Sequence, residues 1–209
     1  MNKNNLFYTG ISGVVLFVVA ALAGSILLKD YNPVTQFISE SYAKDAPYGL
    51  PLRIFGFIPS GFLLTLFSFL SYSRFPANSY TKSGFIALGI FYGMGTVITS
   101  IFPYDSYIYN DLSKVASSSQ HIHNLTGFLT YVFAPLSILS IGLGLRKSSV
   151  EDKLANFSII SSVLLMMLIF ILFSGAVSAF TGILQRIIES IFLLWFVVCA
   201  FNIKAQQNV

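Results

Sequence analysis

Long apolar runs alternate with short polar segments along almost the whole chain, and this alternation predicts membrane-spanning helices. A helix needs about 20 consecutive, mostly apolar residues to cross the hydrocarbon core of a bilayer. Six segments meet this requirement, at residues 10–28, 52–72, 84–102, 124–145, 155–173 and 181–201. We therefore predict an all-α fold, a polytopic transmembrane helical bundle with six transmembrane helices, forming a single domain over residues 1–209.

The last two segments belong to one apolar stretch. From Leu154 to Gln185, roughly 32 residues, no side chain is charged, and that length is too great for one upright span. Small residues at 174–176 and 181–182 favour a tight turn inside the stretch. We therefore predict two helices joined by a turn.

The first segment has a second interpretation. Lys3, the apolar residues after it and the Ala-Leu-Ala at 21–23 together resemble a cleavable signal peptide. The apolar run continues to Leu28, however, which is longer than the core of most signal peptides. We predict a retained helix.

Composition agrees with lipid as the solvent. Only 10% of the residues are charged and the mean hydropathy is +0.76, whereas soluble domains carry about 25% charged residues. The single Cys199 excludes an intrachain disulfide. The chain has no basic stripe and no nucleic-acid-binding motif, so we expect membrane lipid rather than nucleic acid as its partner.

Lysine and arginine are divided unequally between the two sides of such a bundle. The side that holds both termini carries seven of them against two acidic residues, and the other side carries four against five. Because positively charged loops tend to remain in the cytoplasm, we predict that both termini are cytoplasmic.

Two long loops, at 29–51 and 103–122, then lie on the outer side. Tyr31 and Tyr42 in the first loop, and Tyr104, Tyr107 and Tyr109 in the second, make them too apolar for disorder. Long loops in a compact protein are commonly functional. We predict that the two loops fold as caps over one end of the bundle.

The outer side also gathers polar residues. Ser39 and Glu40 follow apolar residues in the first loop, and Asp105 follows Pro103 where the third helix ends. Each acid can serve as a helix cap or a solvated charge, or it can line a site at the mouth of the bundle.

His121, His123 and Asn124 stand at the start of the fourth helix. Two residues apart, the histidines point to nearly opposite sides of a helix, whereas His123 and Gly127 share one face. We therefore predict that His123, and not His121, faces the interior. Glu40, Asp105 and His123 have the chemistry of metal ligands, but they come from three segments without metal-binding spacing, so we assign no metal and no cofactor.

Arg186 and Glu189 lie in the sixth helix, about 7 Å and about 12 Å along its axis from Thr181. At this spacing they can pair with each other. Alternatively, Arg186 reaches an acidic side chain of the outer loops or an anionic head group, since its guanidinium matches carboxylate and phosphate.

No catalytic motif is present, although Ser39, His123 and Asp105 can be arranged on paper as a hydrolytic triad. The polar groups do carry a family resemblance. Residues 32–33 (Asn-Pro), 38–40 (Ile-Ser-Glu), 102–105 (Phe-Pro-Tyr-Asp), 123–124 (His-Asn) with Gly127, and 182–186 (Gly-Ile-Leu-Gln-Arg) resemble the domain of unknown function 998, DUF998. The resemblance implies a six-helix protein of a bacterial inner (plasma) membrane or of an archaeon, and it brings no established activity.

Our leading hypothesis is an integral membrane protein with a polar site at the outer mouth of the bundle that binds a lipid head group or small molecule. The alternatives are an intramembrane hydrolase that uses His123 and nearby acids, with or without a metal, and a small transporter. Whether the chain is an enzyme, and its oligomeric state, stay open. The candidate binding residues are Ser39, Glu40, Asp105, His123, Asn124 and Arg186.

Overall fold

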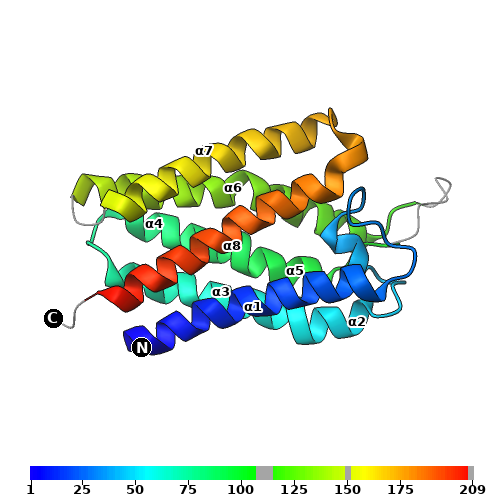
Figure 1. Cartoon of the computed structure of the whole chain (residues 1–209), viewed down its shortest axis with the longest axis horizontal. Helices are drawn as coiled ribbons and strands as arrows, with labels where there is room; N and C mark the ends of the chain where they lie inside the picture. The colour runs from blue at the N-terminus through cyan, green and yellow to red at the C-terminus, as the bar shows by residue number, and fades with distance from the viewer. Residues whose placement is uncertain (107–114, 149–151, 207–209) are drawn as a thin grey trace.

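The helices of the computed structural model run nearly parallel and antiparallel to one another along the length of the molecule (Figure 1). The structure describes residues 1–106, 115–148 and 152–206. Within these residues, six helices are long and apolar enough to cross a membrane, and they run from Lys3 to Leu27, Gly49 to Arg74, Ser79 to Ile101, Ser118 to Ser148, Asp152 to Ser174 and Ser178 to Ala205. The predicted number and order of spans are confirmed, and most of the helices extend past their apolar segments.

The spans are built from shorter elements. The first, fourth and fifth are single helices: α1 (Lys3–Leu27), α6 (Ser118–Ser148) and α7 (Asp152–Ser174). The second consists of α2 (Gly49–Leu52), η2 (Arg53–Phe57), α3 (Ile58–Ser71) and η3 (Tyr72–Arg74); the third of α4 (Ser79–Leu88), η4 (Gly89–Met94) and α5 (Gly95–Ile101); and the sixth of η5 (Ser178–Phe180) and α8 (Thr181–Ala205).

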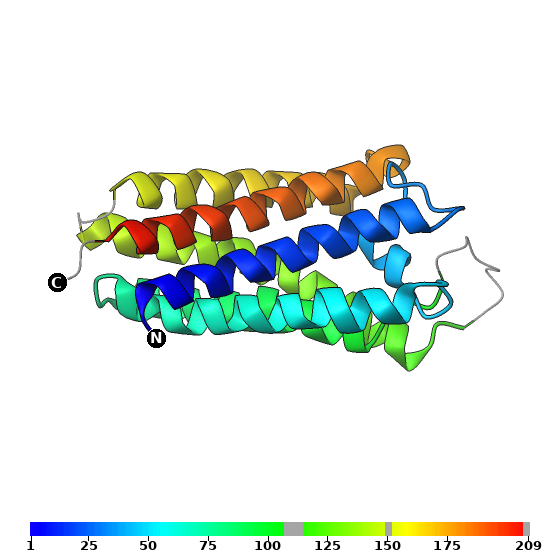
Figure 2. The same ribbon diagram turned by 60° about the horizontal axis from the view of Figure 1, so that its bottom comes forward.

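Contacts between neighbours close the bundle into a ring. α1 lies against α3 on one side and α8 on the other, α7 joins α8 to α6, and α6 packs on α4 and α5, which return to α3 (Figure 2). Lipid suits the outside of this ring, where Phe55 and Phe170 are each three-quarters exposed. Both termini lie at one end, and the connection between α1 and α2 lies at the other, which we call the loop end (Figure 1).

The long apolar stretch divides as predicted. α7 ends at Ser174, and Gly175 follows with φ of 70°. This left-handed conformation suits glycine, which has no Cβ to clash with the backbone. The chain then turns through η5 into α8.

Two spans contain a π-helical turn, η2 in the second and η4 in the third. Pro59 is the second residue of α3, just after η2, and Pro135 lies inside α6. Gly89 and Gly93 in η4 let the third span approach the second closely, because a Cβ on Gly93 would lie 2.7 Å from the backbone nitrogen of Thr65. These two glycines, which have the GxxxG spacing, thus serve packing within the chain.

The first long loop folds over the loop end, as predicted. Its 3-10 helix η1 (Ile38–Tyr42) is buried throughout, and Tyr31 is also buried. Lys44 of the first loop donates its backbone N–H to the carbonyl of Tyr104 in the second loop, and this hydrogen bond joins the two loops. Tyr107 and Tyr109 of the predicted second cap lie outside the described residues.

Candidate functional site

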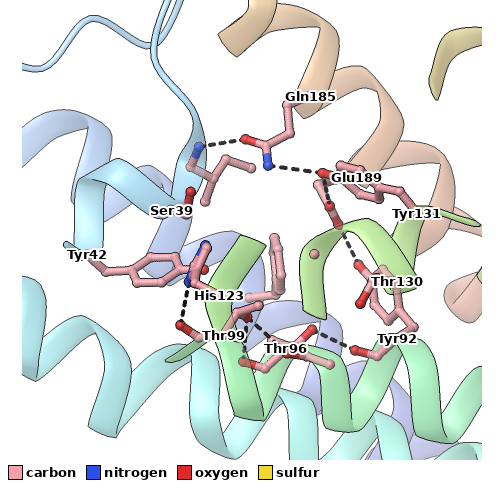
Figure 3. A pocket seen from close by; sticks show the side chains of 14 residues that line it. Ser39, Tyr42, Tyr92, Thr96, Thr99, His123, Thr130, Tyr131, Gln185 and Glu189 are labelled. Carbon is pink, nitrogen blue, oxygen red and sulfur yellow. Dashed lines mark hydrogen bonds between the residues drawn. The ribbon is translucent and has the colours of Figure 1, made fainter. Parts of the chain in front are cut away.

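A polar cavity of about 90 Å³ lies inside the bundle, near the loop end. Its walls come from the third, fourth and sixth spans, with α1 on one side and η1 from the first loop (Figure 3). The cavity is lined by Phe17, Ile38, Ser39, Tyr42, Tyr92, Gly95, Thr96, Thr99, His123, Gly127, Thr130, Tyr131, Gln185 and Glu189.

Glu189 of α8 is the acidic group of this cavity. Its side chain is buried, and its two carboxylate oxygens accept hydrogen bonds of 2.8 Å from the hydroxyls of Tyr92 and Tyr131. Gln185, one helical turn earlier, donates its Nε2 proton to the hydroxyl of Tyr131 at 3.0 Å. Glu189 is therefore bonded to η4 and α6, and not to the neighbouring Arg186 as the sequence allowed.

His123 of α6 faces the same cavity. Its Nδ1 lies 3.0 Å from the carbonyl oxygen of Thr99 and 2.9 Å from that of Phe102. Because carbonyl oxygens only accept, Nδ1 carries a proton, and in the neutral imidazole Nε2 then keeps a lone pair.

The two histidines separate as the helix periodicity predicts. His123 is 7% exposed, whereas His121 is on the surface. Gly127 lines the cavity one turn after His123, and a Cβ built on it would meet no atom within 4 Å. The missing side chain of Gly127 therefore leaves open space beside the imidazole.

The 3-10 helix η1 forms the lid of the cavity. Ile38, Ser39 and Tyr42 line the cavity from this lid. The side chain of Gln185 holds the lid in place, since its Oε1 accepts the backbone N–H of Ile38 at 2.6 Å.

Glu40 belongs to the same lid but is bonded within it. Its carboxylate accepts the backbone N–H of Phe37 at 2.7 Å and the amide of Gln36 at 3.1 Å, and so closes the 3-10 turn. Burial raises the pKa of Glu40, and the two hydrogen bonds and the charge of Arg186 oppose this rise.

Arg186 fastens the first loop to α8. One guanidinium nitrogen donates to the carbonyls of Pro33, Gln36 and Gly182 at 2.9 to 3.1 Å, and the other donates to the hydroxyls of Ser25 and Tyr31. These hydrogen bonds engage both terminal nitrogens of the fork, and Arg186 does not line the cavity.

Asp105 and Asn124 lie around the start of α6. The Asp105 carboxylate accepts both the backbone N–H and the hydroxyl of Ser117, and Asn124 accepts a 2.8 Å hydrogen bond from Gln120. Partial burial raises the pKa of Asp105, but the hydrogen bonds from Ser117, with the nearby charges of Lys44 and His121, lower it overall. Asp105 and Asn124 order the loop end without lining the cavity.

These positions exclude two of the arrangements that the sequence allowed. In a hydrolytic triad the acid accepts the Nδ1 proton of the histidine, whereas Nδ1 of His123 lies against backbone carbonyls. Within the described part of the chain, no three His, Cys, Asp or Glu side chains come together as a metal site. Glu40, Asp105 and His123 are therefore not a common ligand set.

Sequence reasoning missed much of the cavity wall, notably Tyr92, Thr96, Thr99, Tyr131 and the role of Glu189. A signal was present, because polar residues recur at helical spacing: 92, 96 and 99 share one face, 123, 127 and 130 another, and 185 and 189 a third. Each series lies inside an apolar span.

Comparison with known proteins gives one match. The family model described as "Protein of unknown function (DUF998)" matches residues 11–202. No curated protein and no solved structure matches the chain. The matched residues include the whole cavity wall, from Phe17 to Glu189.

Proposed function

We propose that this chain, which belongs to the DUF998 family, binds a small molecule or a lipid head group in the cavity under η1. The observation that carries the proposal is the convergence of Glu189 and His123, from two different spans, on one cavity inside an apolar bundle. An ionisable side chain at membrane depth is costly and marks a functional site by default.

The cavity suits a small polar ligand. A volume of about 90 Å³ holds a few water molecules or a group of similar size. Five of the lining residues are only partly buried, so a ligand can contact them. They are Thr96, Thr99, Gly127, Tyr131 and Gln185. Ser39 and His123 would contact the ligand directly. Glu40, Asp105, Asn124 and Arg186 would hold the lid and the loop end in position.

We propose further that the site opens on the outer side of the plasma membrane, with both termini in the cytoplasm. The Lys and Arg bias toward the side of the termini supports this orientation. Both termini lie at the end of the bundle opposite the loop end (Figure 1), and the cavity lies near the loop end, so cytoplasmic termini put the cavity toward the outer side. Membrane lipid is then the immediate partner of the protein.

A second candidate is hydrolysis in the same cavity. His123 presents an unprotonated Nε2, the form that a general base requires, and Ser39 lines the cavity from the lid. Loss of product formation from a radiolabelled membrane-lipid extract in His123→Gln would support this candidate over simple binding, and unchanged lipid after incubation with the parent protein would exclude it.

Filling the cavity tests the binding proposal. Purified protein would be unfolded thermally with and without ethanolamine, glycerol or sodium phosphate, and in membrane-lipid extract. A ligand at about 100 times its Kd stabilises by about 2.7 kcal/mol, and Gly127→Leu, which occupies the cavity, should remove that stabilisation. Leu125→Phe on the exposed side of α6 is the matched control. A parent protein that none of these conditions stabilises would contradict the proposal.

A further inference from the structure

The cavity wall has used most of its hydrogen-bond donors within the protein. The hydroxyl of Thr96 donates to the carbonyl of Tyr92 at 2.8 Å, that of Thr99 to the carbonyl of Gly95 at 3.0 Å, and that of Thr130 to the carbonyl of Phe91 at 2.6 Å. A hydroxyl has one proton and two lone pairs. These threonines are therefore left with lone pairs to offer.

The tyrosines and the histidine of the cavity have likewise donated their protons within the protein. Tyr92 and Tyr131 each give their hydroxyl proton to Glu189, and His123 gives its Nδ1 proton to backbone carbonyls. What remains toward the cavity is the carboxylate of Glu189 and the lone pair of His123 Nε2. Ser39 and Gln185 keep a proton available for a ligand, since Gln185 has used one of its two Nε2 protons on Tyr131.

The charges of the lining residues also favour a ligand that donates hydrogen bonds, and specifically a cation. Glu189 is the one acidic residue among the described lining residues, and no Lys or Arg is among them. Arg186, on the next face of α8, already donates to carbonyls and hydroxyls of the loop. A phosphate would thus meet a carboxylate without a compensating cation, whereas a cation would meet its counter-ion.

The aromatic rings and the volume of the cavity indicate which kind of cation it can hold. Phe17, Tyr42, Tyr92 and Tyr131 place aromatic rings around the cavity, and such rings attract cations through their faces. A volume of about 90 Å³ admits an ammonium group on a short carbon chain. A trimethylated ammonium is bulkier and has no N–H to donate.

We propose that the ligand of this cavity is a primary ammonium group, held by Glu189 and His123 and by the threonine hydroxyls of α5. This inference rests on the proposed function and names the chemistry of its ligand. A primary ammonium can belong to a free amine or to the head group of an aminophospholipid, and the experiment distinguishes the two sources.

The first part of the test measures charge selection with thiol reagents. Gly127→Cys places a thiol in open space within the cavity, and Val115→Cys, at a position 93% exposed, serves as control. The reagents are the 2-aminoethyl, 2-(trimethylammonio)ethyl and 2-sulfonatoethyl methanethiosulfonates. The parent chain, with its buried Cys199, gives the background.

We expect the aminoethyl reagent to outpace the sulfonate at Gly127→Cys by about tenfold more than at Val115→Cys, which corresponds to about 1.4 kcal/mol. It should also outpace the trimethylated reagent, and Glu189→Gln should abolish both preferences. Asp30→Asn, which removes an exposed carboxylate at the loop end that does not line the cavity, should leave both preferences intact.

The second part identifies the source. Ethylammonium chloride should slow labelling of Gly127→Cys in phosphatidylcholine nanodiscs if the natural ligand is a free amine. Phosphatidylethanolamine nanodiscs should slow it, without added amine, if the ligand is a lipid head group.

Each other result overturns a defined claim. The same reagent preference at Gly127→Cys and Val115→Cys, or protection by neither amine source, overturns the ammonium assignment and leaves a binding cavity. No reaction of Gly127→Cys with any reagent means a closed cavity, which overturns the proposed function as well.

Discussion

Tyr92 and Glu189 stand 97 positions apart in the chain and are joined by a 2.8 Å hydrogen bond inside the bundle. Tyr131 donates to the second carboxylate oxygen at the same distance, so three spans meet at one acidic group. A buried carboxylate is much less costly when its oxygens accept hydrogen bonds. The two tyrosines therefore make it possible for Glu189 to stand at this depth.

Removing one of these hydroxyls should destabilise the protein. We predict that Tyr92→Phe lowers the free energy of unfolding by about 1.5–3 kcal/mol, the usual range for a hydrogen bond to a charged group. The cost should be smaller in a Glu189→Gln background, because the two residues share one interaction. Reversible unfolding in bicelles gives the free energy of unfolding of the parent, the two single variants and the double variant. An equal cost in both backgrounds would show that the hydroxyl acts elsewhere.

Arg186 should act through the first loop rather than through Glu189. Arg186→Lys keeps the charge but loses the fork that reaches the loop carbonyls, and we predict a loss of about 1.5–3 kcal/mol. Tyr31→Phe should be non-additive with it, and Glu189→Gln should be additive within about 0.5 kcal/mol. Recovery of stability in the double variant Arg186→Ala with Glu189→Ala would instead indicate a local ion pair and contradict the structure.

The spans were predictable because hydropathy acts residue by residue, and a bilayer rewards every apolar side chain in a run of the right length. Helix ends were less predictable. α6 begins at Ser118, six residues before the apolar segment at 124–145, because a helix can continue through polar residues into the interface. The hydropathy pattern marks the membrane boundary, whereas backbone hydrogen bonds and caps decide where a helix ends.

The cavity was only partly predictable, for a different reason. His123 and Gly127 share a face of one helix, so a local rule identified them. Glu189 takes its partners from η4 and α6, and no local spacing can indicate such a contact. Arg186 and Glu189 are close in sequence, which suggested that they pair with each other. In the fold, Glu189 instead accepts from Tyr92 and Arg186 donates to the carbonyl of Pro33. Long-range packing decides between locally reasonable partners.

Stability should depend on pH through Glu40. Its pKa in the folded protein is raised above the ordinary value of 4.5, mainly by burial. The folded state therefore binds the proton more tightly than the unfolded state, and stability falls as pH rises from about 4.5 through the folded pKa. We predict that Glu40→Gln flattens this decline in unfolding measurements between pH 4 and 8.

Asp105→Asn is the matched comparison because its shift has the opposite sign. The lowered pKa of Asp105 means that its contribution is present above about 3.8 and is lost as pH falls through the folded value. This substitution should leave the decline above pH 4.5 unchanged. If Glu40→Gln and the parent protein have the same slope there, Glu40 does not titrate in that window.

The topology can be tested in intact cells. We predict that Val115→Cys, at the loop end, reacts with a membrane-impermeant maleimide added outside, whereas Asn2→Cys reacts only after the membrane is permeabilised. The parent chain, with its buried Cys199, controls for background. The reverse pattern would place the cavity on the cytoplasmic side and refute the orientation drawn from the Lys and Arg bias.

The two histidines should differ sharply in their effect on ligand binding. His123 lines the cavity with its Nε2 lone pair, and its ring is fixed by two carbonyls at 2.9 and 3.0 Å. Gln at position 123 has no imidazole ring. It therefore cannot keep Nδ1 on these two carbonyls while it offers Nε2 to a ligand. His121 is exposed, where water can satisfy either of its nitrogens. We therefore predict that His123→Gln removes the ligand-dependent thermal shift and that His121→Gln retains it.

The measurement is the unfolding temperature of each variant with and without ethylammonium chloride, repeated at several pH values around 6.5, the ordinary pKa of histidine. Val97→Ala, a change in the buried core of α5, controls for a general loss of stability, because it should lower the unfolding temperature without abolishing the ligand shift. Loss of the shift in His121→Gln but not in His123→Gln would place the site on the other face of α6. A shift that survives both substitutions would leave Glu189 to bind the cation without an imidazole, and the hydrolytic candidate, which needs His123 as its base, would lose its main support.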